Sequence, residues 1–210
     1  MIRLSIDASA PDPASLALAV NAIRAGGVVA LPTDTLYGLA ADPFDAAAVG
    51  RVFAAKGRGA GRALPLVAAD RAQVEALLGA LSPTAARLAD GFWPGPLTLL
   101  VPAPDRLVAE VTAGTRRVGV RVPAHAVARA LCRACRTVVT ATSANLSGQP
   151  ALADPDAVAA ALGARIDVLI DAGPCPGGAP STIVDVSETP PRLVREGAIA
   201  WQEVQTCLHP

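Results

Sequence analysis

The chain has 210 residues, of which 52% are apolar, 3% aromatic and 17% charged, and 18 basic residues balance 18 acidic ones. This length suits one domain with an aliphatic core, and we expect residues 1–210 to form a single domain. Zero net charge argues against a protein that holds duplex nucleic acid by bulk electrostatics, although it is compatible with a local basic cleft.

The sequence also argues against a membrane or secreted protein. No apolar run approaches the roughly 20 residues that span a bilayer, and residues 1–7 lack a signal-peptide pattern. The four cysteines, Cys132, Cys135, Cys175 and Cys207, do not have the spacing of a disulfide framework. We therefore expect a cytoplasmic protein with reduced thiols.

Helical patterns alternate with short β-rich runs along the chain, which predicts an α/β layer fold with a mixed sheet. Caps and glycines suggest where the helices begin and end. We expect helices at 14–25, capped by Asp12 and stopped by Gly26 and Gly27, at 45–55, after Asp70, from Ser82 to Gly91, at 124–134, and from Asp154 to Gly163. We expect strands at 28–31, 64–68, 97–101, 118–122, 138–142, 168–170, 182–186 and 192–195.

The basic residues include only one lysine, Lys56, and the other 17 are arginines. A compact ammonium differs from a planar guanidinium in size and hydrogen-bond geometry, so this bias suggests that Lys56 has a specific role. Lys56, Arg58 and Arg62 lie on a glycine-rich turn before a strand, which suits a polyphosphate. A solvated basic turn explains the same pattern equally well.

Small polar side chains follow two buried strands. Residues 32–39 read Pro-Thr-Asp-Thr-Leu-Tyr-Gly-Leu, and residues 140–148 carry Thr142, Ser143 and Asn145. Ligands of open α/β sheets gather at the carboxyl ends of strands, so both segments are candidate binding sites. Ordinary turns with local caps are the alternative for each.

Arg121 lies inside an otherwise apolar strand, and a buried arginine requires an anion from the protein or from a substrate. Two other features are weaker. Cys132 and Cys135 lack a second cysteine pair at zinc spacing, so we expect two helix-packed thiols and no metal site. His125 stands at a helix start, where a surface position is the simpler interpretation.

Seven segments in order resemble the YrdC-like family, the threonylcarbamoyl-AMP synthases. Each motif alone is modest, but the ordered set is specific and places the motif-bearing core at about residues 13–199. The segments are 32–39, 55–58, 92–98 (Phe-Trp-Pro-Gly-Pro-Leu-Thr), 120–123 (Val-Arg-Val-Pro), 142–148, 181–185 (Ser-Thr-Ile-Val-Asp) and 193–197.

The resemblance implies a twisted mixed sheet with flanking helices around a deep cavity. It also implies a nucleotidyltransferase reaction, in which ATP, L-threonine and bicarbonate give threonylcarbamoyl-AMP and pyrophosphate, with Mg²⁺ accompanying ATP. The product serves threonylcarbamoyladenosine modification of tRNA by a separate transferase complex, with at most weak tRNA contact by this chain.

The resemblance also assigns residues. Thr35, Arg121, Ala141 and Ser181 are expected to hold L-threonine, Arg121 through the threonine carboxylate and Ala141 through its backbone. Lys56 and Arg58 are the expected catalytic residues. The expected ATP-binding set is Lys56, Arg58, Arg62, Arg117, Ser143, Asn145 and Arg195. Arg117 stands where many members have Ser or Thr, and Gly59 stands where many have proline.

Three other functions remain open. An RNA-binding module with the same fold would show salt-dependent tRNA binding without ATP turnover. A carbamoyl-adenylating paralogue, as in hydrogenase maturation, normally belongs to a larger multidomain chain. A paralogue with another substrate is the hardest to distinguish from sequence.

Overall fold

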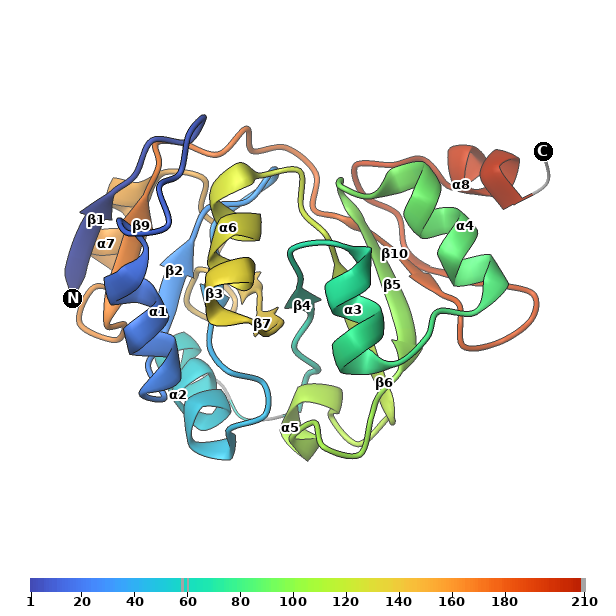
Figure 1. Ribbon diagram of the computed structural model, residues 1–210, viewed down its shortest axis with the longest axis horizontal. Coiled ribbons are helices and arrows are strands. Elements are labelled where there is room, and N and C mark those ends of the chain that lie inside the picture. The colour runs from blue at the N-terminus through green and yellow to red at the C-terminus, as the bar shows by residue number, and fades with distance from the viewer. Residues whose placement is uncertain (58, 60, 209–210) are drawn as a thin grey trace.

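The computed structural model describes residues 1–57, 59 and 61–208. Its strands form two mixed sheets, with helices packed against them (Figure 1). The predicted α/β class and mixed pairing are confirmed, with the strands divided between two sheets. The first sheet has the order β1 (Ile2–Ser5), β9 (Val168–Asp171), β2 (Val29–Leu31), β3 (Gly38–Ala40), β8 (Thr142–Ser143). The second has the order β11 (Arg192–Arg195), β10 (Thr182–Asp185), β5 (Leu97–Pro102), β6 (Arg117–Arg121), β4 (Leu66–Val67), β7 (Val139–Thr140).

Side-chain caps start four helices where the sequence predicts them. Asp45, Asp70, Ser82 and Asp154 each accept hydrogen bonds from backbone N–H groups of the first turn. These bonds satisfy amides that have no partner inside the helix. The four helices are α2 (Ala46–Lys56), α3 (Arg71–Leu78), α4 (Pro83–Phe92) and α7 (Pro155–Leu162). The others are α1 (Ala17–Arg24), α5 (Ala109–Thr112), α6 (Ala126–Cys135) and α8 (Trp201–Leu208).

The predicted cap at Asp12 is wrong. Helix α1 begins at Ala17, and its N-cap Leu16 has no side-chain cap. Asp12 Oδ1 accepts the Ala14 N–H at 3.1 Å, and the Asp12 carbonyl accepts the Ser15 N–H at 3.1 Å. The aspartate therefore closes a separate turn that precedes the helix.

The strand predicted at 138–142 is divided between the two sheets. β7 pairs with β4 in the second sheet, whereas β8 pairs with β3 in the first. Between them the Ala141 N–H donates to the Pro65 carbonyl at 2.8 Å. The chain crosses from one sheet to the other at Ala141, a residue with a predicted ligand role.

The centre of the first sheet, at β2, is buried on both faces, as its continuous apolar sequence predicts. Along β2 and the residue before it, Val28 and Ala30 belong to one hydrophobic cluster, whereas Val29 and Leu31 belong to another. The second cluster includes residues of α1 and α6, such as Ile23. Side chains that alternate along a strand thus pack against helices on opposite faces.

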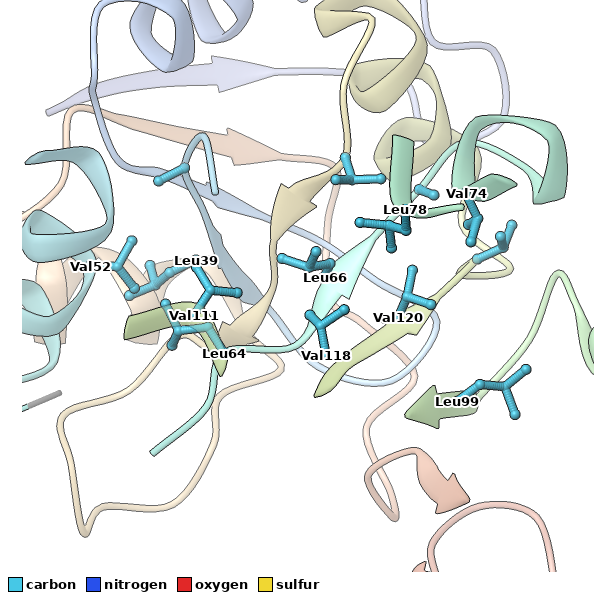
Figure 2. Close-up of a cluster of buried hydrophobic side chains, with 14 of the residues drawn as sticks. Leu39, Val52, Leu64, Leu66, Val74, Leu78, Leu99, Val111, Val118 and Val120 are labelled. Atoms are coloured by element: carbon cyan, nitrogen blue, oxygen red, sulfur yellow. The ribbon is translucent and has the colours of Figure 1, made fainter. Parts of the chain in front are cut away.

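In the second sheet the same alternation separates a core face from a polar face. Figure 2 shows Leu66, Val120 and Leu99 on neighbouring strands, with Val74 and Leu78 of α3 in the same buried cluster. Successive residues of a strand point to opposite faces, so residues 119 and 121 face away from this cluster.

Candidate active site

A cavity of about 680 Å³ is lined by residues from both sheets. Its volume lies within the range of roughly 300–1,000 Å³ that is usual for ligand pockets. All four residues predicted to hold threonine line it, together with three from the predicted nucleotide set. The seven are Thr35, Arg121, Ala141, Ser181, Arg62, Ser143 and Arg195.

Strand register explains why residues far apart in the sequence meet here. β6 runs antiparallel to β5, and β10 runs parallel to β5. The carboxyl end of β6 therefore lies beside the amino ends of β5 and β10, which brings Arg121 near Thr98 and Ser181. Gly119, two residues before Arg121 on β6, also lines the cavity, and a Cβ there would approach Thr98 Cγ2 to 3.1 Å. Glycine keeps this part of the cavity floor open.

The Thr33–Leu36 turn presents Thr35 to the cavity. Thr33 Oγ1 accepts the N–H groups of Thr35 and Leu36, each at 3.2 Å, and donates to the Leu36 carbonyl at 2.7 Å. A hydroxyl that bonds its own local backbone fixes a turn in this way. The tight turn holds Thr35 beside the guanidinium of Arg121.

Arg121 is 6% exposed and forms a buried ion pair. Its Nη2 donates to Asp34 Oδ1 at 3.0 Å, and its two terminal nitrogens lie 3.4 and 3.5 Å from Thr35 Oγ1. Burial lowers the pKa of Arg121, the Asp34 charge opposes this effect, and Arg195 adds to it. The anion that a buried arginine requires is therefore supplied, at least in part, by the protein.

Only one of the two carboxylate oxygens of Asp34 has a hydrogen-bond partner among the described residues. Its Oδ2 is buried and has no hydrogen-bond partner among the described residues. Leaving a buried acceptor unpaired costs about 1–3 kcal/mol, so this oxygen is suited to receive a donor. Asp34 belongs to a motif that the sequence singles out, but the sequence predicts no role for it, because its partner Arg121 lies 87 residues away.

Thr98, Ser181 and Arg195 form a second polar group at the cavity. Thr98 Oγ1 and Ser181 Oγ are 2.8 Å apart, and Arg195 Nη2 donates to the Ser181 carbonyl at 2.7 Å. Partial burial lowers the pKa of Arg195. Thr98 belongs to a motif segment but received no predicted role, so the structure adds it to the candidate site.

Lys56 is 2% exposed and fixes the turn that follows β8. Its Nζ donates to the Ser143 carbonyl, and to the carbonyl and Oδ1 of Asn145 at 3.0 Å each. Ser143 Oγ in turn donates to Asn145 Oδ1 at 2.6 Å. The described cavity lining includes Ser143 but neither Lys56 nor Asn145. The lysine thus holds a wall of the cavity, and its predicted contact with phosphates stays a prediction.

Two other predicted residues have different outcomes. Arg58 lies outside the described residues. Arg117 is not among the described residues that line the cavity. Its Nη1 donates to Asp185 Oδ2 at 2.6 Å and to Glu188 Oε1 at 3.3 Å. These bonds hold Arg117 at the end of β6 remote from Arg121, so the structure does not bring it to the site.

The cysteine pair on α6 lies in the core. Burial raises the pKa of the Cys132 thiol, and it raises the pKa of Cys135 to about 11. A raised thiol pKa disfavours the reactive thiolate. Across the described part of the chain, no group of three or more His, Cys, Asp or Glu side chains could hold a metal ion. Within the same residues, no helix is both long and apolar enough to cross a membrane.

Comparison with known proteins points to one family. The family model for Sua5, YciO and YrdC proteins, described as "Telomere recombination", matches residues 21–197. A threonylcarbamoyl-AMP synthase of Pyrococcus abyssi is 39% identical over 90% of this chain and 55% of its own length. One of Thiobacillus denitrificans is 41% identical over 79% of this chain and 87% of its own length.

A solved structure gives the same indication. The crystal structure of P. abyssi Sua5 complexed with L-threonine superimposes with a TM-score of 0.94 at 36% identity. It covers all of this chain, whereas this chain spans 61% of the P. abyssi chain.

Proposed function

The chain belongs to the Sua5, YciO and YrdC family, and from that premise we propose that it is an L-threonylcarbamoyladenylate synthase. It forms threonylcarbamoyl-AMP and pyrophosphate from ATP, L-threonine and bicarbonate, and the product serves threonylcarbamoyladenosine modification of tRNA. One observation carries the proposal, which is the convergence of Thr35, Arg121, Ala141 and Ser181 on one cavity. The names of the relatives and the threonine complex of P. abyssi Sua5 support it.

The reaction has two steps. Bicarbonate releases hydroxide to give CO₂, and the threonine amine attacks the carbon of CO₂. The proton that leaves the nitrogen combines with the hydroxide as water, and a carbamate remains. A carbamate oxygen then attacks the α-phosphate of ATP, and the bond to the bridging oxygen breaks as pyrophosphate departs. The protein does little covalent work, so its contribution is positioning and the neutralisation of charge.

Each cation of the cavity has a place in this scheme. Arg121 holds the threonine carboxylate, since its guanidinium lies in the cavity wall and shares only one strong ion pair with Asp34. Ser181 and Thr35 offer hydroxyls to the same amino acid. Arg62 and Arg195 neutralise the phosphates, and arginine forks suit phosphate oxygens. Lys56 maintains the position of Ser143 in the wall.

Mg²⁺ enters this scheme as part of the ATP substrate. Protein-bound Mg²⁺ usually relies on one or two carboxylates together with substrate phosphates. The described lining of the cavity has hydroxyls, such as those of Thr142 and Ser143, but no carboxylate. We therefore expect the ion to be held mainly by the phosphates and by water.

The test is to follow labelled bicarbonate into the adenylate while measuring pyrophosphate release. Both should require ATP and L-threonine and should rise together. L-Serine should be the poorer substrate by about 1–3 kcal/mol, the value of one methyl group in an apolar pocket. Pyrophosphate release that ignores threonine contradicts the proposal.

We also propose that this chain does not itself transfer the threonylcarbamoyl group to tRNA. The product is a reactive mixed anhydride, and transfer to adenosine needs an active site that presents the base. Zero net charge gives the chain little general affinity for tRNA. Labelled threonine should enter unmodified tRNA only when a transferase complex is added, and efficient labelling by this chain alone refutes the division of labour.

A further inference from the structure

The chain passes from the first sheet to the second directly after β9, and this connection borders the substrate cavity. Its first part, residues 173–177, reads Gly-Pro-Cys-Pro-Gly and is called the 173–177 brace below. The chain continues through Gly178, Pro180 and Ser181, which line the cavity, and then enters β10. Figure 1 shows the connection from β9 to β10 passing from one sheet to the other.

The brace is hydrogen-bonded to the segment that presents Thr35 to the cavity. Tyr37 Oη donates to the Gly173 carbonyl at 2.8 Å, and the Gly177 N–H donates to the Thr35 carbonyl at 2.9 Å. These two bonds lie at opposite ends of the brace. Both ends are therefore attached to residues 35–37, one of them through a single side-chain hydroxyl.

The middle of the brace contacts the same segment. Cys175 is buried, and its N–H donates to the Ala153 carbonyl at 2.8 Å. Burial raises the pKa of the Cys175 thiol to about 11, and a hydrogen bond from the Thr33 backbone opposes this effect. Three alternate residues of one segment, Thr33, Thr35 and Tyr37, thus each contact the brace.

Tyr37 is the only tyrosine of the chain, and it is fully buried. Its N–H donates to the Leu152 carbonyl at 2.9 Å and its carbonyl accepts the Ala144 N–H at 2.8 Å, so its backbone is fixed. Burial raises the pKa of the Tyr37 hydroxyl, which keeps this group protonated and able to donate. A phenylalanine would bury the same ring, so the tyrosine differs from it by the bond to Gly173.

Thr35 connects the brace to the side of the cavity where Arg121 lies. Its carbonyl accepts the Gly177 N–H, whereas its hydroxyl lies 3.4 and 3.5 Å from the terminal nitrogens of Arg121. Inside the turn, Thr33 Oγ1 bonds to Thr35 and Leu36, which fixes the shape of the turn. The brace adds bonds that place the turn in the fold.

We propose that Tyr37 is a positioning residue for L-threonine, acting through the brace and the Thr33–Leu36 turn. The inference rests on the proposed function, because it concerns the same cavity. The Tyr37 hydroxyl holds the brace against the turn and keeps Thr35 beside Arg121 before the substrate binds. The apparent dissociation constant equals the intrinsic one divided by the fraction of molecules that can bind, so loosening the turn weakens threonine binding.

The test is titration calorimetry of Tyr37→Phe with L-threonine, together with steady-state kinetics of pyrophosphate release. The Kd and the KM for threonine should rise about threefold to tenfold, the size of one neutral hydrogen bond. Because bound threonine selects molecules with the turn in place, kcat at saturating threonine should stay within about twofold of the wild type. The KM for ATP should also stay within about twofold.

Thr112→Val is the matched control. Thr112 is buried on α5, is not among the described residues that line the cavity, and donates to the Ala109 carbonyl at 3.0 Å. Like Tyr37→Phe, this variant loses one buried hydroxyl and its bond to a backbone carbonyl. It should lower the midpoint of urea unfolding without changing the Kd for threonine.

Amide hydrogen exchange, measured by NMR, gives a second readout that does not require turnover. Without ligand, the Gly177 amide should exchange faster in Tyr37→Phe than in the wild type, because the brace opens more often. L-Threonine should slow exchange of this amide in the wild type, since coupling between the brace and the ligand is reciprocal.

Three results would overturn the inference. They are a folded Tyr37→Phe protein with an unchanged Kd for threonine, an equal rise of the Kd in the Thr112→Val control, and Gly177 exchange that neither threonine nor the Tyr37 substitution alters. A wild type that binds no L-threonine would refute the proposed function and this inference with it. Normal threonine binding by Tyr37→Phe would refute the inference alone.

Discussion

The two ends of strand β6 carry the same residue in two different situations. Arg117 and Arg121 lie four residues apart, so they point to the same face of the sheet. Each pairs with an aspartate, Arg117 with the buried Asp185 at 2.6 Å and Arg121 with the partly buried Asp34 at 3.0 Å. Only Arg121 lines the cavity.

The two aspartates differ in how completely they are satisfied. Asp185 accepts the N–H and the hydroxyl of Ser187 on Oδ1 and the Arg117 guanidinium on Oδ2. Asp34 uses Oδ1 alone, and within the described chain its buried Oδ2 has no partner. In the first pair both carboxylate oxygens are hydrogen-bonded, whereas the second leaves one buried oxygen of Asp34 without a partner among the described residues, beside the cavity-lining Arg121. The two pairs therefore differ in how completely the carboxylate is hydrogen-bonded, more than in how deeply it is buried.

The largest expected effect comes from breaking the Arg121 pair. Arg121→Gln leaves Asp34 buried without its cation, so the free energy of unfolding should fall by about 3–5 kcal/mol. Arg121→Gln combined with Asp34→Asn should recover most of that stability but still have a threonine KM raised by orders of magnitude. Urea unfolding and pyrophosphate release measure the two effects.

This pair of variants separates structure from binding. A double variant that is stable and has a normal KM for threonine would show that Arg121 serves only the fold. A double variant as unstable as the single one would show that the cost does not come from the orphaned carboxylate.

The second effect concerns Lys56, the cation that holds Ser143 in the cavity wall. Lys56→Met removes donors from Ser143 and Asn145, so turnover should fall by orders of magnitude while the fold survives. Lys56→Arg should also be poor, because a guanidinium is larger and differently shaped. Steady-state kinetics with varied ATP, together with circular dichroism, measure these changes. Near-normal turnover of Lys56→Met would show the lone lysine to be dispensable.

Arg117→Gln should have a smaller effect, confined to stability. It removes one cation from Asp185, which keeps its bonds from Ser187, so we expect a loss of about 1–3 kcal/mol. The KM values for ATP and threonine should stay within about twofold, because substitutions away from a site usually change little. A raised KM for ATP would instead support the nucleotide role that the sequence suggested.

The smallest expected effect is that the difference in unfolding free energy between wild type and Arg117→Gln depends on pH. Burial raises the pKa of Asp185, but the Ser187 bonds and the Arg117 and Arg192 charges lower it more, so it lies below 3.8. A carboxyl with a depressed folded pKa stabilises the protein above its unfolded pKa, and this contribution disappears as the pH falls through the folded pKa. The difference between wild type and Arg117→Gln should be full at pH 5–7 and shrink below about pH 4. A constant difference from pH 7 to pH 2 would contradict this account.

Local signals allowed much of the fold to be predicted. The caps at Asp45, Asp70, Ser82 and Asp154 act on amides within three residues, so the sequence alone reveals them. The short strand β3 was not predicted, because Gly38–Ala40 has no β-branched residue and owes its conformation to β2 and β8. The passage of the chain from one sheet to the other at Ala141 cannot be predicted from neighbouring residues either. It depends on the Ala141 bond to Pro65 and on the pairing of Ser143 with Gly38, which are distant in the sequence.

Seven of the residues that the sequence suggests for the site line one cavity, but the contacts they make cannot be predicted from the sequence. The sequence points to Arg121 because an arginine in an apolar strand needs an anion. Whether Asp34 or a substrate supplies that anion depends on residues far apart in the sequence, so the sequence alone does not decide it. The prediction that Lys56 contacts phosphates rests on its glycine-rich turn and on the family resemblance. A local pattern cannot reveal that the ammonium of Lys56 donates to Ser143 and Asn145, which lie about 90 residues further along the chain.

The most direct test of the cavity at Arg121 is titration calorimetry with L-threonine and L-threoninol, which lacks the carboxylate. We expect wild type and Arg117→Gln to bind L-threonine equally well. We also expect threoninol to bind at least about 100-fold more weakly, as is usual when a buried charge loses its partner. The double variant of Arg121 and Asp34 should bind neither compound. Equal binding of the two compounds by the wild type, or unchanged threonine binding by the double variant, would contradict the account.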